Sequence, residues 1–191
     1  MRRLIALCAI SCAAWFPMAD AGDIPMSGRF AGTVINHFQL DESGNPAEFI
    51  VSEAEFKGSL GASRLSVLSQ FVPDFSLTVC HPDEIPLVMV YARSVGTFQD
   101  LSVYYASYDN GWICASPGPA GVSSYYGKVT GRIVGGSGRF AGASGQVESN
   151  FHGNDLAGLF VVDCPTCAPE IPFPAYGSFL GTMTGRMILP K

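Results

Sequence analysis

Four tyrosines, Tyr104, Tyr105, Tyr125 and Tyr126, form two adjacent pairs and are the side chains best suited to bind a small molecule. An aromatic ring with a hydroxyl offers apolar surface and one polar handle, which suits a small apolar ligand. We predict that these tyrosines, together with Phe140, line a ligand-binding cavity, with core packing the expected role of half of the tyrosines.

Two carboxylates are the candidates for acid–base catalysis. Glu53 and Glu55 share one face of a strand predicted over residues 47–58. Paired carboxylates catalyse proton transfer when burial separates their pKa values. On a half-exposed strand, however, such a pair usually forms the solvent-facing side, and we favour that interpretation. Tyr105 is the third catalytic candidate.

The histidines, His37, His81 and His152, indicate no established catalytic motif. Ser124, His152 and Asp155 supply the residue types of a nucleophilic triad. The sequence lacks the Gly-x-Ser-x-Gly elbow that would present the serine, so we disfavour this triad. We expect no metal ion and no cofactor.

An even number of cysteines lies beyond the first 21 residues: Cys80, Cys114, Cys164 and Cys167. In an exported chain, an even number favours disulfides. Cys80 ends an apolar run and Cys114 follows a turn, so we predict that these two pair. Cys164 and Cys167 then close on each other, because the prolines after them exclude the helix that a redox-active Cys-x-x-Cys motif needs.

His81 and Asp83 lie next to Cys80 in the sequence Cys-His-Pro-Asp. They offer two metal-ligating groups, but a solvated turn beside a disulfide is the interpretation that we favour. A zinc site would need further ligands, and no second Cys/His pair occurs at suitable spacing.

Short apolar or alternating runs separated by turn residues continue along the chain, and long helical periodicity is absent. This pattern predicts an all-β domain. The strongest hairpin signal is Asp109-Asn110-Gly111, between runs at residues 101–106 and 112–114. A second hairpin is predicted over residues 129–151, with Arg132 and Glu148 paired across it. The other predicted strands are residues 29–38, 49–56, 65–71, 87–91, 156–162 and 178–189.

The hexapeptide Ser-Gly-Arg-Phe-Ala-Gly occurs at residues 27–32 and 137–142, and Gly-Ser-Phe-Leu-Gly-Thr follows at residues 177–182. Glycine within a strand is favoured where the strand bends or where another group approaches its backbone. Alternating small and large residues suit the interior of a small barrel. We therefore predict three coiled strands in a closed sheet, each anchored by an inward ring: Phe30, Phe140 and Phe179.

The segment from Ile133 to Gly145 resembles the hallmark of the allene oxide cyclase and dirigent-protein barrels, especially their secreted bacterial relatives of unassigned function. Residues 98–102, Cys114 and residues 177–185 are similar to the same group. The resemblance implies a calycin-like, antiparallel up-and-down barrel of about eight strands with a central cavity. It implies no single activity, because such barrels host cyclases, stereochemical guides and binding proteins. No catalytic residue of these families transfers to this sequence by position.

The N-terminus has the three parts of a secretory signal peptide: a basic head, an apolar run over residues 4–15, and Ala19-Asp20-Ala21 as the cleavage site. A lipoprotein acylated at Cys12 is disfavoured, because Ala9 stands where a larger aliphatic residue is usual. The apolar run is too short for a permanent transmembrane helix. We expect a signal peptide over residues 1–21, one barrel domain over residues 22–191, and export to the periplasm or the cell exterior.

The formal net charge is −5, and the basic residues are scattered rather than clustered, which argues against a nucleic-acid partner. Three functions remain open. The favoured ones are a non-catalytic barrel that binds a small hydrophobic ligand and a structural module that fills its own interior. The alternative is a cyclase or isomerase, without metal or nucleotide, acting on a small hydrophobic substrate in the cavity. Homo-oligomerisation is compatible with each.

Overall fold

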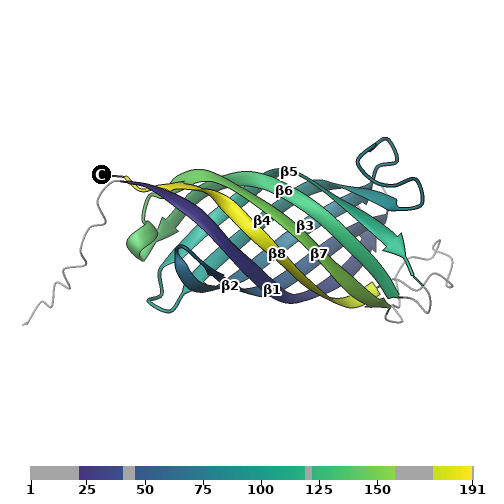
Figure 1. Cartoon of the computed structure of the whole chain (residues 1–191), viewed down its shortest axis with the longest axis horizontal. Coiled ribbons are helices and arrows are strands. Elements are labelled where there is room, and N and C mark those ends of the chain that lie inside the picture. The colour runs from purple at the N-terminus through teal and green to yellow at the C-terminus, as the bar shows by residue number, and fades with distance from the viewer. Residues whose placement is uncertain (1–21, 41–45, 119–121, 158–173, 191) are drawn as a thin grey trace, which may run out of the picture.

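A closed barrel of eight antiparallel strands is formed by the residues that the computed structural model describes, 22–40, 46–118, 122–157 and 174–190 (Figure 1). Each strand pairs with its neighbours in the chain, and β8 pairs with β1, so the predicted all-β, up-and-down barrel is confirmed. The elements are β1 (Asp23–Leu40), β2 (Pro46–Gly58), β3 (Gly61–Pro73), β4 (Ile85–Phe98), β5 (Val103–Pro117), β6 (Val122–Ser137), η2 (Gly138–Phe140), β7 (Ser144–Ala157) and β8 (Pro174–Ile188).

Some sequence predictions fall outside these residues. They are the signal peptide, the alternative acylation at Cys12, residues 158–162 of the strand predicted over 156–162, and the pairing of Cys164 with Cys167. Within the described ranges, the structure has no helix with the length and apolar character needed to cross a membrane.

Side chains along each strand point alternately into the barrel and toward solvent. On β1, Met26, Phe30 and Val34 are buried, and the residues between them include exposed positions such as Arg29 and Thr33. Successive side chains of a strand point to opposite faces, so one set fills the barrel and the other faces solvent. Closure pairs the backbone of β1 with both β2 and β8, which leaves no sheet edge.

Aromatic rings cover glycines on the neighbouring strand. Phe30 is directly opposite Gly181, and a Cβ atom on Gly181 would lie 2.6 Å from Cζ of Phe30. Tyr104 covers Gly96 in the same way on β5 and β4. The predicted reason for strand glycines, close approach of another group, is therefore confirmed at these positions.

Short connections gather at one end of the barrel, the left end in Figure 1, which we call the short-loop end. It carries the β2–β3, β4–β5 and β6–β7 turns. Phe140 lies here on η2, not on a strand as predicted, and it is only 2% exposed. Its ring centroid is 4.9 Å from that of Phe98, and the Arg139 guanidinium lies over both rings. This aromatic cluster fills the short-loop end.

The Asp109-Asn110-Gly111 segment is not a hairpin turn, which corrects the strongest turn prediction. β5 continues through it, and the register shifts between Tyr108 and Asn110, so that Asp109 is the additional residue of a β-bulge. None of these three residues has the positive φ of a tight hairpin turn; Gly111 instead leaves room for Val129, whose Cγ1 would lie 2.7 Å from an added Cβ atom. The bulge changes which residues face inward along the second half of β5.

The predicted Arg132–Glu148 pair is also wrong. Arg132 is opposite Gln146, and its Nε atom lies 2.8 Å from Oδ2 of Asp109 on β5. Glu148 instead binds Lys128, with 2.8 Å between Oε2 and Nζ. Each outward residue has neighbours on two strands, so the bulge at Asp109 gives Arg132 a closer partner on the other side.

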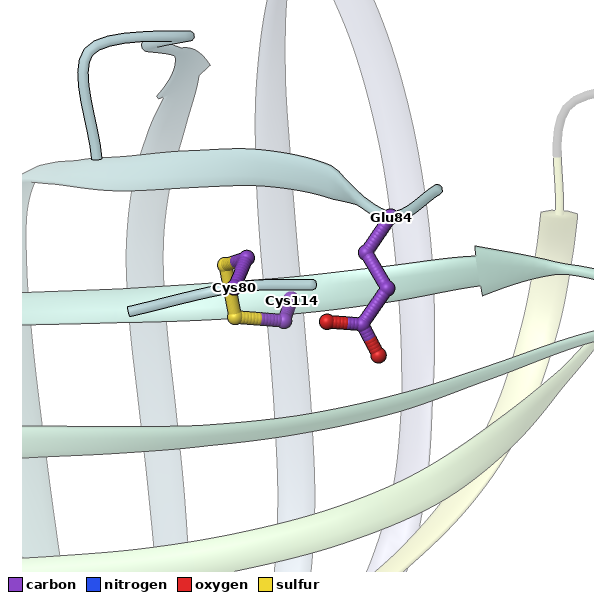
Figure 2. Close-up of side chains that lie close together, drawn as sticks. All are labelled: Cys80, Glu84 and Cys114. Atoms are coloured by element: carbon purple, nitrogen blue, oxygen red, sulfur yellow. A yellow bond between two sulfur atoms is a disulfide. The ribbon is translucent and has the colours of Figure 1, made fainter. Parts of the chain in front are cut away.

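The β3–β4 connection lies at the opposite end, on the right in Figure 1, which we call the long-loop end. There the predicted disulfide between Cys80 and Cys114 is confirmed, with 5.5 Å between the Cα atoms. It joins the connection between β3 and β4 to β5, and Figure 2 shows Glu84 of that same connection beside it.

Candidate functional site

The five predicted ligand-binding residues lie in three different places. Tyr104, 0% exposed, and Phe140 belong to the packed core of the short-loop end. Tyr105, 43% exposed, lies on the outer face. Tyr126 is also exposed, and its hydroxyl donates a hydrogen bond to Glu84. Only Tyr125 faces the interior near the long-loop end, so the structure does not bring the five together.

Glu53 and Glu55 alternate with the buried residues Ala54 and Phe56, so both point away from the barrel interior. The Glu53 carboxylate accepts a hydrogen bond from Nε of Arg64 at 2.8 Å. Hydrogen bonding from Ser66, opposed by partial burial and aided by Arg64, lowers the pKa of Glu53. This is the solvent-facing arrangement that we favoured, and it places neither carboxylate beside an interior ligand.

The histidine-based alternatives gain no support. Ser124 and His152 are exposed on β6 and β7, and no hydrogen bond joins them in the described part of the chain; the side chain of Asp155 lies outside the description. The backbone of His37 belongs to β1, and its side chain is likewise outside. His81 Nδ1 lies 3.5 Å from Oδ2 of Asp83, and both side chains are largely exposed, as expected for a solvated turn.

Cys80, Glu84 and Cys114 bring three potential metal-ligating atoms within 4.8 Å (Figure 2). The two sulfurs are bonded to each other, which removes the thiolates that a metal would need. The Glu84 carboxylate accepts hydrogen bonds from the His81 backbone N–H, the Tyr126 hydroxyl and the Ser116 hydroxyl, and these bonds lower its pKa, the first most strongly. The cluster therefore fastens the β3–β4 connection to β5 and β6.

The interior near the long-loop end is different. Three rings there face inward but remain partly exposed: Tyr125, Phe151 and Phe179. We call them the aromatic layer. The ring centroids of Tyr125 and Phe151 are 6.5 Å apart, and Phe179 lies 5.7 Å from Phe30 of the core. Further partly buried apolar side chains pack against the same core: Ile24, Ile50, Val67, Leu87 and Val129.

Glycines shape the aromatic layer. Tyr125 is opposite Gly153, and Phe151 is opposite Gly127, on β6 and β7. A Cβ atom on Gly127 would lie 2.8 Å from Cζ of Phe151, so a larger residue there would displace the ring. The alternation of aromatic and glycine on these two strands is a signal in the sequence from which Phe151 could have been predicted.

A cluster of hydroxyls lies deeper in the barrel. The Tyr108 hydroxyl is 3.2 Å from Oγ of Ser94, and Ser149 of β7 faces the same tyrosine. Burial raises the pKa of Tyr108, and the two serine hydroxyls work against the shift. Burial, with a smaller effect of Tyr108, also raises the pKa of Tyr104. Both tyrosines therefore remain neutral hydrogen-bond donors at physiological pH.

No charged side chain is among the buried residues that the structure describes. The buried polar groups are asparagine and serine: Asn36, Ser63, Ser69, Ser94, Ser102, Ser107 and Ser149. A general acid or base usually needs a group that titrates near the working pH. The described interior offers neutral hydroxyls and apolar side chains.

Comparisons with models of known protein families, with curated proteins and with solved structures find no match to this chain. The resemblance to the allene oxide cyclase and dirigent barrels therefore stays a prediction from the residue pattern.

Proposed function

We propose that the protein is an exported, non-catalytic barrel that binds a small apolar molecule against the aromatic layer at its long-loop end. The observation that carries this proposal is the contrast between the short-loop end and the β6–β8 side of the long-loop end; on β3 to β5, inward residues near that end, such as Phe71, Met89 and Ile113, are buried. The short-loop end is packed with fully buried rings, whereas Tyr125, Phe151 and Phe179 face inward and retain exposed surface.

A ligand that covers these rings removes apolar surface from water, which favours binding. Aromatic rings also add specific edge and face contacts to an apolar partner. The resemblance to the allene oxide cyclase and dirigent barrels supports the same proposal, because those barrels act on small molecules held inside.

A cyclase or isomerase is the alternative, and Tyr108 is the residue that favours it. Its buried neutral hydroxyl is able to donate a hydrogen bond to a substrate carbonyl or epoxide. We prefer binding, because no buried carboxylate or histidine among the described residues accompanies Tyr108. Turnover abolished by Tyr108→Phe, with binding retained, would establish the enzyme instead.

The test is titration of the purified protein with the uncharged fluorescent probe N-phenyl-1-naphthylamine. We expect saturable binding that Tyr125→Ala weakens about tenfold, about 1.4 kcal/mol. Tyr105→Ala is the matched control, because the same ring is removed from the outer face and binding should not change. Mass spectrometry of molecules that co-purify would identify the natural ligand.

Absence of saturable binding, together with no co-purifying molecule, would favour the structural module over the binding barrel. An equal effect of the two tyrosine substitutions would place the bound probe elsewhere than the aromatic layer.

A further inference from the structure

We propose that the molecule bound at the long-loop end carries one uncharged hydrogen-bonding group, a hydroxyl or a carbonyl, directed at the hydroxyl cluster of Tyr108, Ser94 and Ser149. This inference rests on the proposed binding function and specifies the chemical class of the ligand.

The hydroxyl cluster is assembled from strands that are distant in sequence. Ser94 is on β4, Tyr108 on β5 and Ser149 on β7. All three side chains are buried, with Tyr108 and Ser149 each 4% exposed. The bulge at Asp109 follows Tyr108 directly, so Tyr108 is the last inward residue of β5 before the register shifts.

The cluster lies directly beneath the aromatic layer. On β7, Ser149 stands between buried Val147 and partly exposed Phe151, all on the inward face. Ser149 is also directly opposite Val129 on β6, another inward residue that is only partly buried. A ligand covering Phe151 and Val129 would therefore meet Ser149 as the next residue inward.

Below the cluster the barrel is closed to a ligand. Met183, 1% exposed, is directly opposite Ser149 on β8, and the Tyr104 hydroxyl donates to its sulfur at 3.7 Å. From there to the short-loop end the interior is occupied by buried rings and methionines. The hydroxyl cluster is thus the polar group next inward from the aromatic layer; because it is buried, a ligand entering past that layer would contact it only by displacing the side chains that cover it.

The three hydroxyls of the cluster can form more hydrogen bonds than those described above. Each hydroxyl offers one donor and two acceptor positions. Oγ of Ser149 is near enough to Tyr108 to affect its titration, yet it makes no hydrogen bond of ordinary geometry in the described part of the chain. Buried polar groups are normally paired, so a ligand hydroxyl or carbonyl at this position would supply the missing partner.

The charge of a ligand's head group determines how well it suits the hydroxyl cluster. A carboxylate or an ammonium group would lose its hydration at the cluster, and no oppositely charged side chain is among the buried residues described. Tyr108 is held neutral by burial and provides no countercharge. Neutral hydroxyls therefore favour an alcohol, aldehyde, ketone or ester over a fatty acid or an amine.

The experiment uses displacement of N-phenyl-1-naphthylamine by four molecules of equal chain length at pH 8: octane, 1-octanol, 2-octanone and octanoate. We expect octanol and octanone to displace the probe at concentrations about tenfold lower than octane, and octanoate to be the weakest. Ser149→Ala should remove the advantage of octanol over octane and leave octane unchanged.

Ser63→Ala is the matched control, because Ser63 is another buried serine without a hydrogen-bond partner for its hydroxyl, but it lies opposite Phe98 at the short-loop end. It should leave all four affinities unchanged. Tyr108→Phe provides a second variant that removes one hydroxyl without removing the ring.

The outcomes separate the two proposals. If the probe binds and octane competes as well as octanol, or octanoate competes best, the inference about the head group is wrong while the binding function stands. If Ser63→Ala changes the octanol preference as much as Ser149→Ala, the hydroxyl cluster is not the contact. If neither the probe nor any competitor binds, the binding function itself fails.

Discussion

The two copies of Ser-Gly-Arg-Phe-Ala-Gly have the same residues and different structures. Residues 27–32 are part of β1, where the backbone is extended and paired on both sides. Residues 137–142 end β6, form η2 and begin the turn into β7. Both copies bury their phenylalanine, Phe30 at 5% and Phe140 at 2% exposure. One sequence therefore serves as strand in one place and as turn in the other.

The glycines of the two copies are needed for different reasons. In the strand copy, a Cβ atom on Gly28 would lie 2.6 Å from Cε2 of Phe56, so glycine leaves room for a ring. In the turn copy, Gly138 and Gly142 have φ of 61° and 71°, a conformation that side chains disfavour, and an added Cβ atom would also lie 2.5 Å from Oγ of Ser102 or 2.8 Å from Cγ of Pro190, respectively. The comparison shows that a glycine pattern alone does not tell close approach from positive φ.

The arginines differ as well. Arg29 points outward from β1, opposite Lys57 and Thr182. Arg139 lies over the Phe98 and Phe140 rings at 4.5 and 4.7 Å, and its Nη2 donates to the Leu60 carbonyl at 2.9 Å. Side-chain contacts of Arg139 thus add to the turn's own backbone hydrogen bonds in the turn copy, whereas the strand copy is paired through its backbone with two neighbouring strands.

The largest expected effects come from the two phenylalanines. Phe30→Ala and Phe140→Ala should each lower the free energy of unfolding by about 3–5 kcal/mol, because both rings are buried. Urea denaturation measures both, with Phe75→Ala, an exposed ring, as control. A loss below about 1 kcal/mol in either variant would show that its ring is not part of the core.

Substitutions of glycine should distinguish a steric clash with a neighbouring side chain from the energetic cost of a positive φ. At Gly142, alanine should cost about 1–2 kcal/mol, and asparagine should cost less because it tolerates positive φ; the neighbour that an added Cβ atom would meet, at 2.8 Å, is the exposed ring of Pro190, which we expect to shift in both variants. At Gly28, asparagine should be at least as damaging as alanine, since the Phe56 ring occupies the space. Urea denaturation of the four variants tests this, and equal losses from alanine and asparagine at Gly142 would contradict the conformational explanation.

The arginine comparison predicts a smaller difference. Arg139→Ala should lower the free energy of unfolding by about 1 kcal/mol, because a cation over aromatic rings is lost. Arg29→Ala should change it by less than about 0.5 kcal/mol, as is usual for an exposed position. Similar losses for both would mean that the ring contacts of Arg139 contribute nothing measurable.

The smallest effect concerns acid stability of the turn copy. The Asp100 carboxylate accepts the Ser102 backbone N–H at 3.1 Å, and this bond, with Arg139 nearby, lowers the pKa of Asp100. A lowered folded-state pKa stabilises the protein above the unfolded-state pKa and loses that effect as pH falls through the folded-state value. Asp100→Asn should therefore reduce the dependence of stability on pH below about 4. Urea denaturation at pH 3 and pH 6 measures this. If the difference in the free energy of unfolding between the two pH values is the same in Asp100→Asn as in the unaltered protein, the prediction is wrong.

Particular residues show why the sequence predicted the barrel better than the site. The inward Phe30 and the antiparallel class were predicted correctly because alternation of side chains is a local pattern, and the Cys80–Cys114 pair, 34 residues apart, was predicted from an even number of cysteines and their places beside an apolar run and a turn. Asp109-Asn110-Gly111 was mistaken for a turn, because the same residue types occur here in a bulge without positive φ, where Gly111 leaves room for Val129. That error concealed the inward direction of Tyr108. The two adjacent tyrosine pairs misled for a related reason, because neighbouring residues on a strand face opposite ways.

The sequence by itself determined the strand-forming alternation, because alternation depends on residue types at short spacing; it indicated the Cys80–Cys114 pair, which the structure then showed. Only the tertiary structure decided which copy of the hexapeptide is strand and which is turn, and it alone placed Ser94, Tyr108 and Ser149 around one point. Those three residues come from three strands, and their meeting depends on register and closure. Register is set by pairing over the whole sheet, which no short segment contains.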